Sequence, residues 1–197
     1  MPFIDITPGT LLSPTPVVMV SCASETEKAN IITIAWAGTV NSSPPMLSVS
    51  VRPNRFSHHI IKDSGEFVVN LVSRELAKAT DFCGVKSGAN LDKFDACGLT
   101  PLKLQSMRYA PAIAQAPFFL ACKVHQTIEL PSHTMFIGQI VENGVQENLL
   151  DADGRIAMER ADLTAYCHGE YFGLAEKLGF FGYSIARPEV LARRMGK

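Results

Sequence analysis

The segment from Val51 to His59 brings together groups that bind phosphate. Arg52 ends an apolar stretch, and Arg55 and Ser57 follow at the start of a predicted helix, for which Asn54 is the expected N-cap. Free backbone N–H groups at a helix start, a hydroxyl and two guanidinium groups are favourable partners for an anion. A capped helix with two solvated arginines would have the same sequence, so this segment alone leaves both interpretations open.

The apolar stretch from Asn30 to Gly38 is a second candidate. It holds the only tryptophan of the chain, Trp36, and the small residues Ala37 and Gly38 leave room for a flat ligand to approach the backbone. Backbone N–H and C=O groups of such a strand can pair with the heteroatom edge of a ring system. Trp36 could equally be a core aromatic residue, the more frequent role of a tryptophan.

A glycine-containing loop and the lysine after it form a third candidate. Gly84, Ser87 and Gly88 predict a tight loop, and Lys93 follows in the first turn of the next predicted helix. A lysine at that end of a helix is unfavourable against the helix dipole. We therefore expect a negative group near Lys93, either Asp92 or the electron-rich edge of a ligand.

His133 lies at the tip of a predicted hairpin, directly before Thr134. Histidines at strand ends are commonly surface residues, and a place in a ligand site is the alternative interpretation.

Sequence motifs for metal binding and for hydrolysis are missing. The chain contains no H-E-x-x-H, no C-x-x-C and no G-x-S-x-G motif, so we predict no metal site and assign no catalytic side chain. The cysteines are odd in number and widely spaced, which favours reduced thiols over a disulfide framework. They are Cys22, Cys83, Cys97, Cys122 and Cys167.

Short apolar stretches bounded by Pro, Asn, Ser or Gly predict the strands that position these residues. The predicted strands span Val17–Cys22, Ile31–Ala37, Met46–Val51, Phe67–Leu71, Phe118–Leu130 and Thr134–Val145. Apolar residues alternate along Phe118–Leu130, so one face of this strand should be buried and the other wet. The break Pro131–His133 predicts an antiparallel hairpin with the strand that follows.

Helical patterns are fewer. Helices are predicted between Pro53 and Gly65, over Arg74–Cys83 and over Leu91–Cys97. The last two should end at Gly84 and Gly98, which would supply left-handed caps. Many short strands with a few inserted helices predict a mainly β protein, a closed or partly closed antiparallel barrel rather than alternating βαβ units.

Composition narrows the class of protein. A chain of 197 residues with 47% hydrophobic and 19% charged residues predicts a single folded domain over residues 1–197. The formal net charge of -1, without a long basic run, argues against a nucleic-acid partner. No apolar run reaches the roughly 18 residues of a membrane span, and no signal-peptide pattern is present, so we expect no membrane partner and a cytoplasmic location.

In their order and spacing, these segments resemble the flavin-reductase-like family, and most closely its flavoredoxin branch. The resemblance runs from about Ser13 to Ser184. Its carriers are Asn30–Trp36, Pro44-Pro45, Arg52–Ser57, Ser64–Asn70, Ser87-Gly88, Asp92–Phe94, Gly98–Pro101, His133–Gly138 and Phe181–Ser184. The resemblance implies an FMN-binding split β-barrel that forms a homodimer, with the flavin near the dimer interface.

The resemblance also implies which residues bind the cofactor. Those expected to line the flavin are Asn30, Thr33, Ala35 and Trp36. Those expected to hold its phosphate are Arg52, Arg55 and Ser57. Lys93 and His133 are expected to approach the isoalloxazine from the other side, and Tyr171 to cover the ring.

The resemblance leaves the function open between two redox classes. An NAD(P)H-dependent flavin reductase would pass electrons from FMN to free flavin, iron or another acceptor. A flavoredoxin-type carrier would hold FMN tightly and exchange electrons with a partner protein without using nicotinamide, and a non-redox flavin-binding protein of the same fold is a third interpretation. The missing G-x-G-x-x-G motif excludes none of them, because in this family the nicotinamide stacks directly on bound flavin.

Overall fold

The centre of the molecule is a seven-stranded sheet in which every neighbouring pair of strands is antiparallel. In spatial order it consists of β3 (Asn30–Ile34), β2 (Val18–Cys22), β6 (Glu66–Leu71), β9 (Phe118–Glu129), β10 (Thr134–Val145), β5 (Pro45–Val51) and β4 (Ala37–Ser42). The computed structural model describes residues 1–195, so Gly196 and Lys197, the last residues of the predicted domain, lie outside the described part.

The sheet curls into a half-barrel because a short bend joins its two edge strands. β3 and β4 lie at opposite edges, yet only Ala35 and Trp36 separate them in the chain. The N–H of Ser50 on β5 donates to the carbonyl of Trp36 over 3.0 Å and fixes the bend. The predicted mainly β split barrel is confirmed. The single strand predicted over Ile31–Ala37 is wrong, because one straight strand could not belong to both edges.

The predicted hairpin is confirmed as β9 and β10, with the N–H of Leu130 donating to the carbonyl of His133 over 2.8 Å. Register shifts after Ile137 and Ile140 mark irregularities of the bulge type, which increase the local twist. The predicted buried face of β9 is confirmed only near the barrel. Towards the tip the apolar positions open to solvent, and Leu130 is 44% exposed.

Gly138 on β10 allows the barrel wall to pack closely. A Cβ here would lie 2.6 Å from Cζ of Phe67 and 2.8 Å from Cβ of Cys122. Both neighbours are fully buried in the barrel core. Alternate residues of β2, among them Val18 and Val20, belong to the same core. The core therefore leaves no space for any side chain at position 138.

Helices α1 (Phe56–Ser64), α2 (Ala77–Val85) and α3 (Lys93–Ala96) complete this part of the fold. Asn54 is not the N-cap of α1: a turn closed by the bond from Arg55 N to Arg52 O precedes the helix, which begins at Phe56 with Arg55 as its N-cap. Gly84 is not a cap either: α2 continues to Val85, and Gly84 instead gives close packing, since a Cβ there would lie 3.2 Å from Cβ of Thr33. Gly98 adopts the predicted left-handed conformation, with φ of 63°.

A second apolar core attaches α2 and α3 to the strands β2 and β3. Met19 and Ile31 contribute from the strands, and Cys83 and Phe94 contribute from the helices. Smaller elements surround the barrel. They are β1 (Thr15–Pro16), β11 (Thr164–Cys167) and β12 (Glu170–Gly173) in one sheet, β7 (Pro101–Leu102) paired with β8 (Ala112–Ile113), and 3-10 turns at Arg74–Leu76, Glu147–Leu149, Met158–Ala161 and Tyr183–Ile185.

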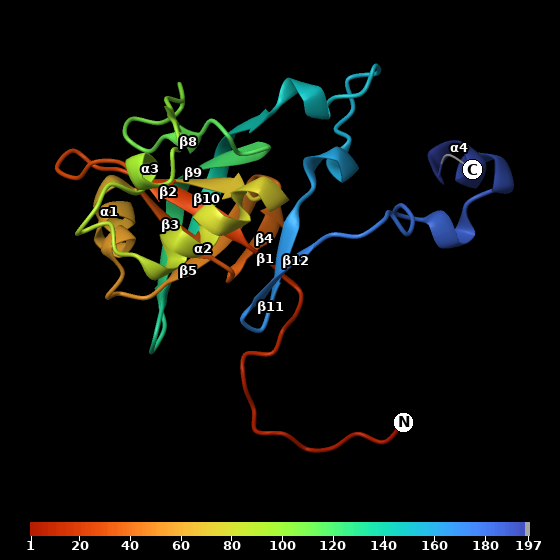
Figure 1. The fold of residues 1–197 in the computed structure, drawn as a ribbon, viewed down its shortest axis with the longest axis horizontal. Helices are drawn as coiled ribbons and strands as arrows, with labels where there is room; N and C mark the ends of the chain where they lie inside the picture. Colours follow the sequence, from red (N-terminus) through yellow and green to blue (C-terminus); the bar gives the residue numbers. More distant parts are fainter. Residues whose placement is uncertain (196–197) are drawn as a thin grey trace.

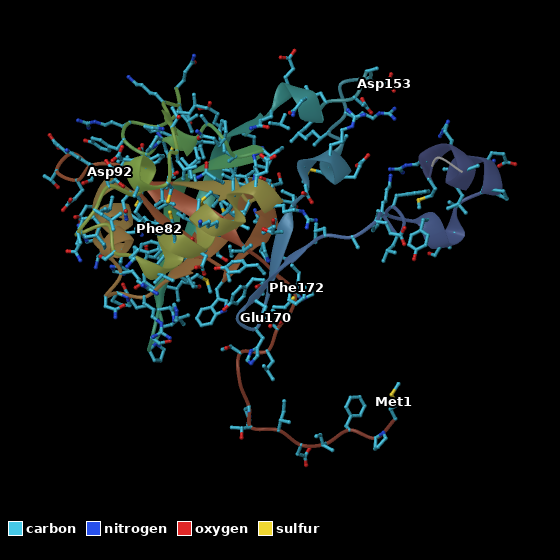
Figure 2. The ribbon with its side chains drawn as sticks, viewed as in Figure 1. Met1, Phe82, Asp92, Asp153, Glu170 and Phe172 are labelled. Atoms are coloured by element: carbon cyan, nitrogen blue, oxygen red, sulfur yellow. The ribbon has the colours of Figure 1, made fainter. Side chains whose placement is uncertain are left out.

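Both ends of the chain leave the barrel (Figure 1). Residues 1–12 form an exposed, extended arm with Met1 at its free end, and the segment after β12 ends in α4 (Pro188–Met195), well apart from the barrel. Side chains crowd around the barrel and become sparse along both arms (Figure 2). None of the described helices is long and apolar enough to cross a membrane.

Candidate functional site

A cavity of about 470 Å³ opens at the bend between β3 and β4. Its volume lies in the range of small-molecule pockets, roughly 300–1,000 Å³. One wall comes from the bend and the end of β5, and the other from α2 and the β11–β12 hairpin. The predicted site residues that line it are Thr33, Ala35, Trp36, Arg52, Arg55, His133 and Tyr171.

A narrower chamber of about 90 Å³ shares Ile32, Arg55 and Gly84 with this cavity. The predicted site residues that line it are Asn30, Arg55, Ser57 and Lys93. All the cofactor-binding residues predicted from the sequence therefore meet in one elongated site. Aromatic rings border the wide end, and the narrow end holds the Asn30 amide, the Ser57 hydroxyl and Lys93.

Asn30 and Ser57 form the floor of the narrow chamber. The Asn30 side-chain amide donates to the Ser57 hydroxyl oxygen over 2.8 Å, and both residues are buried. Ser57 lies in the first turn of α1, where backbone N–H groups lack helical partners. Gly88 packs directly on Asn30, since a Cβ there would overlap the amide group. The loop around Gly88 therefore forms the wall of the chamber beside Asn30.

Arg52 and Arg55 supply the positive charge of the site. Both side chains are exposed, and neither forms an ion pair with another residue of the range 1–195. Arg55 lines both parts of the site, whereas Arg52 lines only the wide cavity. Within residues 1–195, both guanidinium groups are therefore free to bind an anion.

Lys93 plays a different part from the one expected. Its ammonium is buried and donates to the backbone carbonyls of Ile31 and Cys83, each over 2.7 Å, and burial lowers its pKa. Asp92 caps the helix by accepting from two backbone N–H groups and so balances its dipole. Lys93 thus lies behind β3 at the narrow chamber and does not share the wide cavity with His133.

His133 and Trp36 form an aromatic wall of the wide cavity. Their ring centroids are 4.5 Å apart with an interplanar angle of 57°. Burial, followed by the positive charge of Arg52, lowers the pKa of His133, so the neutral ring is favoured at neutral pH. Trp36 remains 42% exposed, which leaves part of the indole available to a ligand.

A hydrogen-bond chain fixes α1 against the β9–β10 hairpin behind this wall. The Thr134 hydroxyl donates to Glu129 over 2.8 Å and pairs with Nε2 of His58 over 2.9 Å. Thr134 therefore accepts from the Nε2–H tautomer of His58, whose pKa is lowered chiefly by burial. The chain holds Ser57 and His133, the neighbours of His58 and Thr134, at a fixed separation.

Tyr171 stands across the cavity from these rings. Its hydroxyl lies 3.2 Å from a carboxylate oxygen of Asp81, and burial is the first of several causes that raise its pKa to about 12. Thr33 is less available to a ligand, because its hydroxyl already donates to the carbonyl of Thr80.

The wide cavity is also lined by Asp81, Tyr166 and Gly169, which were not predicted from the sequence. The sequence does contain a signal that points to Tyr166 and Gly169. His168 and Gly169 both have positive φ, 47° and 99°, as a two-residue type I′ hairpin turn requires. A histidine-glycine pair between short aromatic stretches indicates such a turn, whereas nothing in the sequence around Asp81 distinguishes it from other helical carboxylates.

The site suits a ligand with a flat ring system and an anionic tail. Aromatic rings and the Arg52 guanidinium border the wide end, the Ser57 hydroxyl and the Asn30 amide lie at the narrow one, and the Arg55 guanidinium lies where the two meet. Within the described residues no group of three or more His, Cys, Asp or Glu side chains could hold a metal ion.

Comparison with known proteins identifies a family. The family described as "Flavin reductase like domain" matches residues 11–175. The structure of flavoredoxin from Desulfovibrio vulgaris (Miyazaki F) superimposes with a TM-score of 0.85 at 32% identity, covering 90% of this chain and 96% of that one. Flavoredoxin from Methanosarcina acetivorans gives a TM-score of 0.84 at 27% identity, covering 91% and 95%.

A curated relative with a named activity is more distant. The reductase component of the FADH(2)-dependent resorcinol hydroxylase from Rhizobium sp. is 25% identical over 133 residues. The aligned part covers 68% of this chain and 72% of that protein.

Proposed function

The chain belongs to the flavin-reductase-like family, and on this basis we propose that it binds FMN and reduces flavin with NADH or NADPH as electron donor. The observation that carries the proposal is the shape of the site: a wide cavity bordered by aromatic rings and a narrow chamber that holds Asn30 and Ser57, the two sharing Arg55. The cavity matches the ring system of a flavin in character, and the chamber matches its phosphorylated tail.

In this proposal each residue has a definite task. Arg55 and Ser57, at the start of α1, hold the phosphate, and Arg52 reaches it from the side of the wide cavity. Asn30 orients the sugar-alcohol chain. Trp36 and neutral His133 border the ring. Bound FMN would supply the redox chemistry itself, while the protein supplies position and electrostatics.

Access to the ring supports use of a nicotinamide. The wide cavity is open to solvent beside Trp36, which is 42% exposed, so a second flat ring could reach the flavin there. Hydride transfer requires the reacting atoms to approach within about 3–3.5 Å, a distance that direct stacking provides.

A second candidate is an electron carrier with tightly bound FMN and no direct use of nicotinamide. The likeness to two flavoredoxins over about nine-tenths of the chain favours it. The two candidates differ in one step, the entry of electrons from NADH or NADPH.

Anaerobic reduction separates the candidates. FMN-loaded protein is mixed with NADH or NADPH, and bleaching of the visible flavin band is followed. Rapid bleaching by either nucleotide is the expected result. If dithionite bleaches the flavin but neither nucleotide does so within minutes, the reductase proposal is lost and the carrier replaces it. A protein that binds no FMN would refute both.

We further propose that the protein is a homodimer whose terminal arms pack on the partner. Large apolar side chains on the arms are almost fully exposed, among them Phe3, Ile4, Leu178, Phe181 and Ile185. Exposed apolar patches of this kind mark interaction sites. Together, residues 1–12 and 174–195 are comparable in length to the roughly 20–30 residues on one side of a standard interface.

Light scattering on the full chain tests the dimer. The parent should have twice the mass of one 21.4 kDa chain, and Phe181→Ser with Leu178→Ser should shift it towards monomer. Glu176→Ser, an exposed polar change in the same arm, is the matched control. A monomeric parent at micromolar concentration would refute the dimer.

The free cysteines Cys22, Cys83, Cys97, Cys122 and Cys167 support a reducing compartment, and we propose the cytoplasm.

A further inference from the structure

Two cysteines from different helices meet beside the narrow chamber. The Sγ atoms of Cys83 on α2 and Cys97 at the end of α3 are 3.9 Å apart. Both are free thiols; Cys83 is fully buried and Cys97 is partly exposed. A disulfide has an S–S distance of about 2.05 Å, so an approach of roughly 2 Å would join them.

The backbone around the two thiols is already held together. The Lys93 ammonium donates to the carbonyl of Cys83 over 2.7 Å, and the N–H of Cys97 donates to the carbonyl of Lys93 over 3.2 Å. Lys93 therefore ties the same two segments that a disulfide would tie. The two thiols are therefore held close to each other in the reduced protein.

The two thiols differ in their access to reagents. Burial raises the pKa of Cys83 to about 12, which makes its thiolate rare at neutral pH. Cys97 is the thiol that solvent and a small oxidant can reach. Cys97 therefore suits the attacking position, and Cys83 suits the resolving one.

The segment between the cysteines closes the narrow chamber. Lys86, Ser87 and Gly88 line it, and Gly88 packs directly on Asn30, the partner of Ser57. A bond between the ends of this segment would restrict its freedom. Asn30 and Ser57 would respond to that restriction, because the loop contacts them directly or through one hydrogen bond.

We propose that Cys83 and Cys97 form a reversible disulfide that fixes the loop over the narrow chamber and thereby controls FMN retention. The sulfur of Cys97 attacks a small-molecule disulfide, forms a mixed disulfide and releases one thiol. The sulfur of Cys83, after losing its proton, attacks the sulfur of Cys97 and displaces the second thiol. Two protein thiols are oxidised to one disulfide, and one small-molecule disulfide is reduced to two thiols.

Oxidised glutathione is the probe for this site, applied to the full chain without FMN. The parent should lose two alkylatable thiols and two hydrogen masses, and digestion should give a peptide pair linked through Cys83 and Cys97. Cys167→Ser, which removes another partly exposed cysteine, should behave like the parent, whereas Cys97→Ser should form no crosslink. A stable glutathione adduct on Cys97, or a parent that keeps all its thiols, would overturn the disulfide.

The link to FMN rests on the proposed function and has its own readout. Trp36 emission is titrated with FMN in the reduced and the oxidised protein. Because apparent affinity rises as the binding-competent fraction rises, the oxidised form should bind at least about threefold more tightly. Equal affinities would overturn the coupling. A crosslinked protein that binds FMN in neither state would refute the proposed function, while the disulfide, measured without FMN, would stand.

Discussion

Replacement of Arg55 should separate binding of the phosphate from binding of the ring. Its side chain is exposed, unpaired within the described residues 1–195, and common to both parts of the site. Arg55→Ala should therefore change the free energy of unfolding by no more than about 0.5 kcal/mol, as surface substitutions usually do.

The expected loss of FMN affinity follows from the lost charged contact. Hydrogen bonds to charged groups contribute roughly 1.5–3 kcal/mol, and each 1.4 kcal/mol is tenfold in affinity, so the range is about 10- to 150-fold. Because the guanidinium is exposed, solvent screening favours the lower end, about tenfold. Riboflavin lacks the phosphate, and its affinity should change less than about twofold.

Quenching of Trp36 emission measures both affinities, because Trp36 is the only tryptophan and lines the wide cavity. Arg155→Ala, an exposed arginine that lines neither part of the site, is the matched control. An equal loss for FMN and riboflavin would refute the assignment of Arg55 to the phosphate. Unchanged FMN affinity would remove Arg55 from the site.

Three further predictions concern stability. Gly138→Ala should lower the free energy of unfolding, measured with urea, by about 1–3 kcal/mol because the added methyl group overpacks the core. Gly38→Ala, where a Cβ would meet open space, should lower it by less, and equal losses for the two variants would contradict this. Lys93→Met leaves two buried carbonyls without their donor and should cost about 2–4 kcal/mol, so an unchanged urea midpoint would show that the ammonium is dispensable. The lowered pKa values of His58 and His133 mean that the unfolded chain binds protons more tightly, so their contribution is present above about pH 6.5 and is lost as pH falls. The thermal midpoint should fall between about pH 7.5 and pH 5, and by less in His58→Gln; an identical fall in the variant would show that His58 does not contribute.

The strands and the polar end of the site could be predicted from local sequence. Alternation of apolar residues predicts the β9–β10 hairpin, and the arginines beside Ser57 indicate a partner of negative charge. These features depend on neighbours in the chain. The local order of residue types is therefore sufficient to predict them.

The remaining features depend on contacts between distant segments. The break at Ala35–Trp36 arises because β3 and β4 belong to opposite edges of one sheet, which no local pattern encodes. Lys93 turns inward because the carbonyls of Ile31 and Cys83 meet there, 62 and 10 residues away in sequence. The opposite wall of the cavity comes from Tyr166 and Tyr171, which only the tertiary fold brings close to Trp36.

The order of strands in the sheet also governs how the molecule is made on the ribosome. Val51 on β5 pairs with Thr134 on β10, so this pairing can form only after residue 134 has been synthesised. The edge strand β4 pairs only with β5. Such distant pairing is slow, because the entropy of closing a long loop is lost before the contacts form. The cavity also needs Tyr166 and Tyr171, which are translated later still. The nascent chain therefore emerges with its first strands unclosed, and the ligand site is completed only after most of the protein has been synthesised.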